Sequence, residues 1–333
     1  MPSPRESAAV PRDPLVFVVG CPRSGTTLLQ RILDHHPELA IANDTHFVTR
    51  VLDEHDPRAA ERVMHGEPIP LEAGLVERVR GYRRMHRLGL GDAAFACAAA
   101  RSRTYAEFVG AVYEAHASQH GKAYGGEKTP DFVRRLPLLH ALCPDSKFVH
   151  IVRDGRDVAL SLVNWATPTK GPGRLPGWSD DPLALAMLWW RWQVTSGRED
   201  ATLLRAGSVL ELDYAELVGT PVEVTVRLCG FLGLPYVDSM NEYHAGRRRD
   251  EAGLSAKASW LPPVAGLRDW RTQLDEPDQA LFELLAGDLR EELGHPRGAS
   301  SASLAVRGRA DAARARFDEV LRRKAAKRAS RTA

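Results

Sequence analysis

The stretch LVFVVGCPRSGTTLLQRILD, residues 15–34, decides the fold. Residues 15–19 are a continuous apolar run, typical of a strand buried on both faces of a parallel sheet. From residue 26 to residue 34 the apolar side chains recur at helical spacing, and Pro37 ends that pattern. A turn that carries two glycines joins the two segments. We therefore expect a buried strand, a tight turn and a helix, the opening unit of an α/β fold.

The same alternation of strand and helix recurs along the chain. Residues 147–152 and 209–212 are further strand candidates, and residues 41–43 form a short candidate after the first helix. Helical patterns cover residues 57–120, 154–165, 183–197, 221–234 and 275–293. Residues 166–181 are rich in Pro and Gly, which predicts a loop. Together these segments predict a doubly wound, mostly parallel sheet flanked by helices.

Composition excludes several classes of protein. The chain has 333 residues, of which 44% are hydrophobic and 26% charged, as in ordinary globular proteins. Its net charge is only +2, so we expect no nucleic-acid partner, and any anion site must be local. No apolar run is long enough for a membrane span, and residues 1–13 lack the apolar core of a signal peptide. We therefore expect a cytoplasmic protein, and the abundance of Arg and Ala favours a bacterial origin.

The cysteines predict neither a disulfide framework nor a zinc site. Cys21, Cys97, Cys143 and Cys229 are scattered, and none belongs to a CxxC pair or a Cys/His cluster. We expect reduced thiols and no metal ligands.

Three segments are expected along the chain. Residues 1–13 read as a disordered lead, residues 14–296 as a single domain, and residues 297–333 as a basic tail rich in Arg and Ala. The tail is expected to be a solvated helix or a frayed end, and the alternative is a contact with an acidic partner or a membrane surface. The sequence leaves the oligomeric state open, a homodimer included.

The turn after the first strand has the features of a phosphate-binding loop. Amides at a helix N-terminus have no intrahelical acceptor, and the helix dipole adds partial positive charge. Gly25 lets the backbone approach an anion closely, and Thr26 and Thr27 add hydroxyl donors. Gly20 and Gly25 are spaced as in a Walker A loop, but Thr26 stands where that loop has lysine. The cation is Arg23 instead, so the loop should hold a phosphate-like group other than a metal-bound triphosphate.

A second anion site is expected after the strand at residues 147–152. Arg153 ends that strand, and Ser161 lies about two helical turns further on. A strand-end arginine and a helical hydroxyl can converge on one phosphate. The alternative is a surface ion pair of Arg153 with Asp154 or Asp157. Taken together, the two sites predict one ligand that carries a 5′-terminal anion and a separate 3′-phosphate.

Five motifs, in order, resemble those of sulfotransferases that use 3′-phosphoadenosine-5′-phosphosulfate (PAPS). Residues 22–27 (PRSGTT) resemble the loop that holds the 5′-phosphosulfate, and residues 151–161 (IVRDGRDVALS) resemble the 3′-phosphate motif. Residues 126–130 (GEKTP) look like a segment of bacterial members and of glycan sulfotransferases. Residues 214–217 (YAEL) and 231–234 (FLGL) are similar to two later family motifs. The resemblance, to the branch with glycan and tyrosylprotein sulfotransferases, implies a P-loop-like sulfotransferase fold, PAPS as co-substrate and no metal.

The resemblance also implies residues that bind the donor. Those for the 5′-phosphosulfate are Arg23, Ser24, Gly25, Thr26 and Thr27. Arg153 and Ser161 would bind the 3′-phosphate, and Tyr214 would lie by the adenine. Residues 266–271 (GLRDWR) look like the segment that closes over the 3′-phosphate, although the order of Gly and Arg differs from the commonest pattern. Arg268 in that segment is a further expected phosphate ligand.

Sulfuryl transfer, by analogy with phosphoryl transfer, needs cations at the transferring group and a base on the acceptor. Arg23 and Lys128 are the candidate cations, although Lys128 could instead pair with Glu127. Asp44 is the favoured base, because it stands where glycan-type members have the longer Glu. His46 is the competing base, and its alternative role is a packed core or supporting residue.

The resemblance implies transfer to a hydroxyl or amine of a small-molecule, glycan or lipid acceptor. The acceptor is expected to contact residues 45–120 and 166–181, where motifs are absent. One alternative is a P-loop kinase or NTPase, which would require Mg²⁺ and the missing loop lysine. The other is a non-catalytic nucleotide-binding relative, favoured only by Asp44 in place of Glu.

Overall fold

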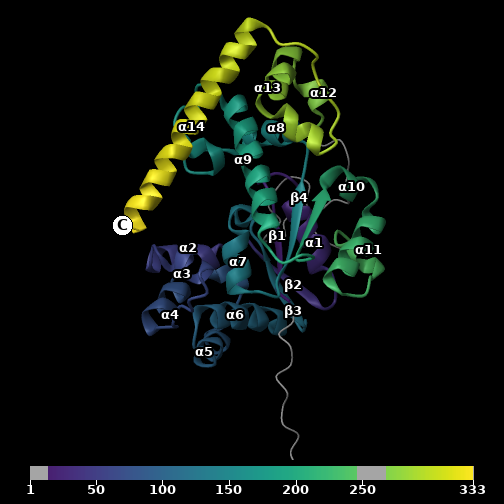
Figure 1. Ribbon diagram of the computed structural model, residues 1–333. Coiled ribbons are helices and arrows are strands. Elements are labelled where there is room, and N and C mark those ends of the chain that lie inside the picture. The colour runs from purple at the N-terminus through teal and green to yellow at the C-terminus, as the bar shows by residue number, and fades with distance from the viewer. Residues whose placement is uncertain (1–13, 246–267, 333) are drawn as a thin grey trace, which may run out of the picture.

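The computed structural model describes residues 14–245 and 268–332, and its centre is one parallel sheet (Figure 1). Within these residues the strands are β1 (Val16–Val19), β2 (Leu39–Asn43), β3 (Tyr124–Lys128), β4 (Lys147–Val152) and β5 (Val209–Asp213). Their order is β2-β3-β1-β4-β5, and every neighbouring pair is parallel. The predicted α/β fold is therefore confirmed. The expected disordered lead, residues 1–13, and the start of the predicted closing segment, residues 266–267, lie outside the described residues.

Strand β1 lies in the middle of the sheet, and this position decides where a ligand can bind. It pairs with β3 on one side and with β4 on the other. In open parallel sheets, ligands bind beyond the carboxyl ends of the strands, where the strand order reverses. The segments that follow β1, β3 and β4 meet at that edge, and they carry most of the predicted site residues.

Helices cover both faces of the sheet, because successive side chains of a strand point to opposite faces. Phe17 and Val19 pack on the face covered by α2 (Phe47–His55), α3 (Ala59–Met64), α4 (Ala73–Arg80), α5 (Asp92–Ala100), α6 (Tyr105–Gln119), α7 (Leu136–Leu142) and η2 (Pro130–Arg134). Val16 and Val18 pack on the other face with α1 (Thr26–Asp34), α10 (Tyr214–Gly219), α11 (Pro221–Leu232) and η4 (Asp238–Glu242).

A third group of helices packs together beyond the carboxyl ends of the strands (Figure 1). It contains α8 (Gly155–Trp165), η3 (Gly171–Arg174), α9 (Pro182–Thr202), α12 (Trp270–Gln273), α13 (Glu276–Glu292) and α14 (Leu304–Thr332). Helix α9 is long and contacts α8, α13, α14 and η2. It therefore links this group to the rest of the molecule, and Trp190 at its centre is fully buried.

Most of the expected elements are present with nearly the expected bounds. The helix at residues 26–34 and the strand at residues 147–152 are reproduced in the structure, and the short candidate at residues 41–43 is the end of β2. The expected loop at residues 166–181 also contains the short helix η3.

Strand β3 was not expected from the sequence pattern, because it contains two glycines. A Cβ on Gly125 would lie 2.5 Å from the carbonyl oxygen of Tyr113, and a Cβ on Gly126 only 2.0 Å from that of Val16. Glycine normally weakens a strand, but here only glycine lets the neighbouring backbones approach. Close packing with α6 and β1 therefore overrides the low strand propensity of this segment.

The predicted basic tail, residues 297–333, largely forms helix α14. Its buried residues recur at helical spacing and join the core built on α9 and α13; they are Val306, Ala310, Ala313, Phe317 and Val320. Arg309 adds ion pairs to Asp181 and Asp278. The division into a domain and a tail stays a prediction, but the first two thirds of α14 pack as part of the molecule.

Candidate active site

The turn between β1 and α1 brings backbone amides to the carboxyl edge of the sheet. Gly25 has a φ of 97°, and a Cβ there would lie 2.4 Å from the Tyr214 ring, so glycine is required. Arg23 also has a positive φ of 79°. No side chain caps α1, so the amides of its first turn remain available to an anion. Ser24 Oγ is buried and makes no hydrogen bond to a described residue.

Arg23 is held over the helix that follows β4. Its Nε donates to Ser161 Oγ at 2.9 Å. The pKa of Arg23 is lowered, first by burial and then by the positive charges of Arg153 and Arg268. Three arginines from distant parts of the chain therefore gather at this edge of the sheet. Like charges in proximity cost free energy unless an anion lies among them, so the cluster indicates an anion site.

Arg153 forms the ion pair with Asp157 that the sequence offered as the alternative to phosphate binding. It has an exposed fraction of only 9%, and its Nη2 lies 3.3 Å from Asp157 Oδ2. Its guanidinium lies over the Tyr214 ring, with Cζ 4.4 Å from the centroid. Arg153 Nε is nevertheless buried without a hydrogen-bond acceptor among the described residues. A phosphate oxygen could accept from it without breaking the contact to Asp157.

Asp157 connects this site to the segment that contains Arg268. Its Oδ1 accepts a hydrogen bond from the Trp270 backbone at 3.0 Å while its Oδ2 contacts Arg153. Burial raises the pKa of Asp157 above its usual value. Nearby, the fully buried Arg156 pairs with Asp154, so the ion pair of Asp154 that the sequence offered to Arg153 is taken by Arg156.

Asp44 and His46 follow β2 in a strained turn. Both have left-handed backbone conformations, with φ of 61° and 66°, which are uncommon for residues with side chains. His46 Nε2 lies 2.9 Å from Asp44 Oδ1. The other carboxylate oxygen, Oδ2, accepts from Arg84 and Arg87, each at 3.0 Å. The turn therefore places an imidazole against a carboxylate that two guanidinium groups already hold.

These contacts determine the charge of Asp44. Burial alone would raise its pKa, but the hydrogen bond with His46 and the charges of Lys128 and Arg84 hold that pKa well below its usual range. A carboxylate this strongly stabilised is a weak proton acceptor. The role of Asp44 as the base therefore stays a prediction.

The Glu127 carboxylate holds the same turn through hydrogen bonds. It is fully buried and accepts from the Thr45 backbone at 2.7 Å, from Thr45 Oγ1 at 2.5 Å and from the His46 backbone at 2.9 Å. The Tyr113 and Thr129 hydroxyls donate to it as well. A buried carboxylate is stable only with such a set of donors. The Glu127 carboxylate thereby fixes the backbone that carries His46.

Lys128 ends β3 beside this turn. Its exposed fraction is 5%, and burial lowers its pKa, while Asp44 and Glu127 act in the opposite direction. Its carbonyl oxygen accepts from the Asp44 backbone at 2.8 Å. The structure therefore brings Lys128 together with Asp44 and His46, and it brings Arg23 together with Arg153, Ser161 and Arg268.

Sequence reasoning missed several residues of this site. Arg84 and Arg87 lie in RGYRRMHR, residues 80–87, whose four arginines besides His86 were a usable but unread signal. Lys170, from the loop after α8, lies near enough to Arg23 and Asp44 to be affected by their charges, although burial is the main reason that its pKa is lowered.

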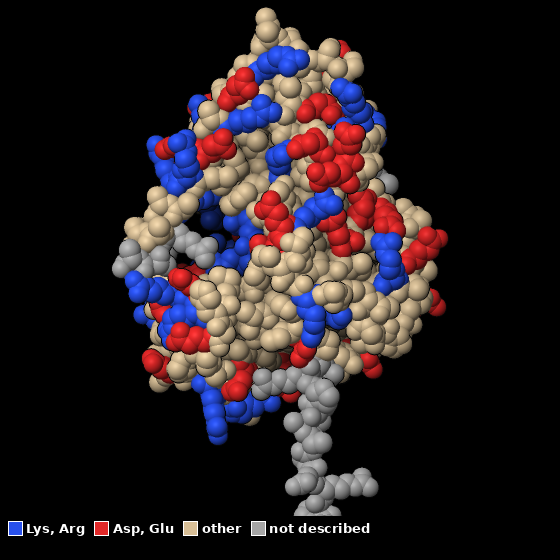
Figure 2. Space-filling view, viewed as in Figure 1, with Lys and Arg blue, Asp and Glu red and all other residues tan. Residues whose placement is uncertain are grey.

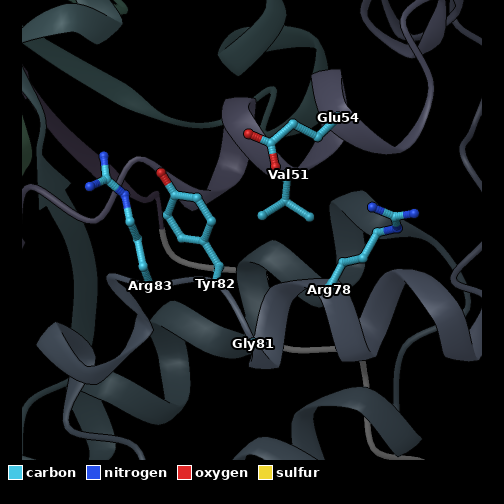
Figure 3. A pocket seen from close by; sticks show the side chains of 6 residues that line it. All are labelled: Val51, Glu54, Arg78, Gly81, Tyr82 and Arg83. Carbon is cyan, nitrogen blue, oxygen red and sulfur yellow. The ribbon is translucent and has the colours of Figure 1, made fainter.

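A separate hollow of about 410 Å³ lies between α2 and α4 (Figure 3). Its lining residues are Val51, Glu54, Arg78, Gly81, Tyr82 and Arg83. None of them belongs to the anion cluster, but Arg83 directly precedes Arg84, which holds Asp44. The hollow therefore adjoins the segment that supports the turn after β2.

The described residues contain neither a metal-ligand cluster nor a helix suited to cross a membrane. No group of three or more His, Cys, Asp or Glu side chains among them could hold a metal ion. Within the same residues, no helix combines the length and the apolar character that a membrane crossing requires.

Comparison with known proteins gives one family. Residues 14–238 match the profile described as "Sulfotransferase family". A putative protein-tyrosine sulfotransferase of Caenorhabditis briggsae is 24% identical over 239 residues, which cover 70% of each chain. Nodulation protein NoeE of Sinorhizobium fredii is 26% identical over 327 residues, 89% of this chain and 70% of that protein. In structure, the sulfotransferase domain of the curacin biosynthetic pathway is similar with a TM-score of 0.57 and 18% identity, covering 85% of this chain and 98% of that one.

Proposed function

Because the chain belongs to the sulfotransferase family, we propose that it transfers a sulfuryl group from PAPS to a hydroxyl or amine of a small-molecule, glycan or lipid acceptor. The observation that carries the proposal is the gathering of Arg23, Arg153 and Arg268 at the N-terminus of an uncapped helix. PAPS supplies the sulfuryl group and carries anions at both its 5′ and 3′ ends.

The residues present fit that donor at its 5′ end. The first-turn amides of α1, the unpaired Ser24 Oγ and the Arg23 guanidinium offer donors to a phosphosulfate. Thr26 and Thr27 lie in the same turn and would add hydroxyl donors. A negative group at a helix N-terminus is further stabilised by the helix dipole.

The fit extends to the nucleoside and the 3′-phosphate. Arg153 Nε lacks an acceptor among the described residues, and Ser161 lies within hydrogen-bond distance of Arg23. Arg268 adds a third cation, whose charge affects Arg23. The Tyr214 ring, between Arg153 and Gly25, would border the adenine.

His46 would take the proton of the acceptor, and Asp44 would orient it. An imidazole is in general a better proton acceptor near neutral pH than a carboxylate with a lowered pKa. The hydrogen bond between Asp44 Oδ1 and His46 Nε2 fixes the ring, and positive charge on the ring would be stabilised by the carboxylate. The sequence favoured Asp44 as the base; the present proposal exchanges the two roles and keeps both residues.

Lys128 and Arg23 would stabilise the transferring group. Lys128 ends β3 and Arg23 follows β1, and these two strands are neighbours in the sheet. Their charges would offset the negative charge that develops on the oxygens of the sulfuryl group and the leaving phosphate. Buried cations are more effective in this role than exposed ones, because water does not screen them.

The test is a transfer assay with the full chain. Purified protein is incubated with radiolabelled PAPS and extracts of small molecules, glycans and lipids, with excess EDTA present. We expect labelled product and release of 3′-phosphoadenosine-5′-phosphate (PAP), and Arg23→Met should abolish both. Phosphoryl transfer from ATP that requires Mg²⁺ would favour a kinase instead, and tight PAP binding without transfer in any extract would favour a non-catalytic relative.

A further inference from the structure

A cluster of two cations and two indole rings lies where η2, α9 and α14 meet. Arg134 Cζ lies 4.3 Å from the centroid of the Trp192 ring, and Lys324 Nζ lies 4.8 Å from the same ring. Lys324 Nζ is also 5.2 Å from the Trp189 ring. We call Arg134, Trp189, Trp192 and Lys324 the cation–indole cluster. It joins residues from three elements that are far apart in the sequence.

The cation–indole cluster adjoins the phosphate-binding turn. Gly20, at the start of that turn, donates from its backbone to the Pro130 carbonyl oxygen at 3.4 Å. Pro130 opens η2, the short helix that carries Arg134. Asp131 and Arg134 lie close enough to Cys21, also in the turn, to affect its pKa, although burial is the main reason that this pKa is raised. The short helix that carries Arg134 therefore contacts the phosphate-binding turn directly.

The charges of the cluster are poorly balanced. The pKa of Lys324 is affected by the charges of Arg134, Asp131 and Arg174. The pKa of Arg134 is affected by Asp131 and also by the positive charge of Arg50. Asp131 contacts Arg134 at 3.5 Å, and it is the carboxylate that faces these cations. Burial on the indole rings, followed by the charge of Arg134, lowers the pKa of Lys324 to about 8. An anion between the cations would relieve this repulsion.

Neutral donors in the same place also lack acceptors. Trp189 Nε1 and Gln193 Nε2 are buried and make no hydrogen bond to any described residue. Gln193 is part of the surroundings of the cluster, because its Oε1 accepts from Arg134 Nε at 3.0 Å. Buried donors are normally paired, so two of them beside two cations indicate a site for oxygen atoms.

Helix α14 holds Lys324 in this place. Phe317 packs against Trp192 with ring centroids 6.2 Å apart, and Val320, one turn before Lys324, is buried. The side chain of Lys324 is covered on one side by the indole rings and remains exposed to solvent elsewhere, so a ligand can reach it. In Figure 2, Lys and Arg side chains gather inside a hollow between the arm of the molecule formed by α14 and the helices below it.

We propose that the cation–indole cluster binds a negatively charged group of the acceptor, such as a carboxylate, phosphate or sulfate. The acceptor would then lie between α9 and α14 while its hydroxyl or amine faces His46. This inference rests on the proposed function, because it places the acceptor beside the phosphate-binding turn. It also gives the C-terminal helix a part in the choice of acceptor.

The test compares two probes that differ only in charge, 4-hydroxyphenylacetate and its neutral amide. Each is titrated by calorimetry into the full chain saturated with PAP, so that the nucleotide occupies its own anion sites. We expect the acid to bind about two- to fivefold more tightly than the amide, the effect of one partly exposed ion pair. Lys324→Met should remove this preference, and Lys324→Arg should keep it.

The matched control is Arg323→Met. Arg323 is the neighbour of Lys324 on α14, but its guanidinium pairs with Glu319. This variant loses the same charge and should keep the preference for the acid. Equal affinity for acid and amide, no binding of the acid up to about 10 mM, or an unchanged preference in Lys324→Met would each overturn the proposal. Failure to bind PAP would instead contradict the proposed function.

Discussion

Arg23 Nε donates a hydrogen bond to Ser161 Oγ at 2.9 Å, although 138 residues separate them. The loop after β1 and the helix after β4 are therefore joined directly through the two side chains assigned to opposite ends of the donor. A ligand that engages one anion position is then placed at the other, because both positions follow neighbouring strands of one sheet. This relationship is the basis of the first two predictions.

PAP should stabilise the protein much more than AMP or ATP. AMP lacks the 3′-phosphate that Arg153 and Ser161 would bind, and ATP has a triphosphate where the loop lacks the Walker lysine. Thermal-shift titrations measure this, because a ligand stabilises the folded state by RT ln(1 + [L]/Kd). Equal shifts with PAP and AMP would contradict a second anion site.

Arg153→Ala should weaken PAP binding by about 1.5–3 kcal/mol, which is roughly 10- to 150-fold in Kd. The reason is the loss of a buried, charge-assisted donor to the 3′-phosphate. Ser161→Ala should cost less, because a neutral hydroxyl is a weaker donor. Calorimetric titration gives Kd, and Arg227→Ala is the control, since Arg227 forms only an exposed pair with Glu216. If Arg153→Ala keeps the wild-type Kd, that residue is merely an ion-pair partner of Asp157.

His46→Gln should reduce kcat by about 10²–10⁴-fold while PAP still binds, because the acceptor would lose its base. Asp44→Asn should also reduce kcat, because the imidazole would lose the partner that orients it. Both variants are assayed with saturating PAPS and an acceptor found in the transfer assay. A His46→Gln enzyme near wild type, together with an inactive Asp44→Asn, would return the base role to Asp44.

Glu127→Gln should destabilise the protein by roughly 2 kcal/mol or more, because a neutral amide cannot accept from every donor that now surrounds the carboxylate. It should also reduce kcat, since the turn that presents His46 is no longer held. Chemical denaturation and turnover are measured together. Tyr113→Phe removes one donor and should show a milder form of both effects.

The control for Glu127 is Glu114→Gln, because Glu114 forms only an exposed pair with Arg101. Its stability and turnover should stay near those of the wild type. Unchanged turnover in both Glu127→Gln and Tyr113→Phe would show that Glu127 has no part in placing the base.

Asp200→Asn should stabilise the protein at neutral pH. Burial raises the pKa of Asp200 to about 6, despite a hydrogen bond from the Leu136 backbone. Because the folded carboxyl binds its proton more tightly than the unfolded one, the wild type loses stability as pH rises from about 4 to about 6. The variant should avoid this loss and gain at most about 3 kcal/mol at pH 7.

Denaturation curves at acid and neutral pH test this prediction. Near pH 3.5 the carboxyl is protonated in both states, so the two proteins should have equal stability. Glu114→Gln is the control, because Glu114 forms an exposed pair with Arg101 and should change stability little. A variant that gains the same stability at both pH values would contradict the role of ionisation.

The local sequence was sufficient to predict an element where a single pattern of apolar residues dominates the segment. The helix at residues 26–34 and the strand at residues 147–152 have the expected bounds, because their apolar periodicity is unbroken. The segment at residues 124–128 gave no such signal. Its glycines are required by the backbones of Tyr113 and Val16, which lie far away in the sequence.

The candidate site divides in the same way. A glycine-bearing turn with Arg23, placed between a strand and a helix, indicates an anion site from sequence alone, because the amides that bind the anion are neighbours along the chain. The electrostatic surroundings of Asp44 and Lys324, in contrast, depend on the tertiary structure. Arg84 and Arg87 reach Asp44 from another segment, and α14 brings Lys324 onto the indoles of α9. Electrostatic interactions depend on distance in space, and only packing of the whole chain makes such residues neighbours.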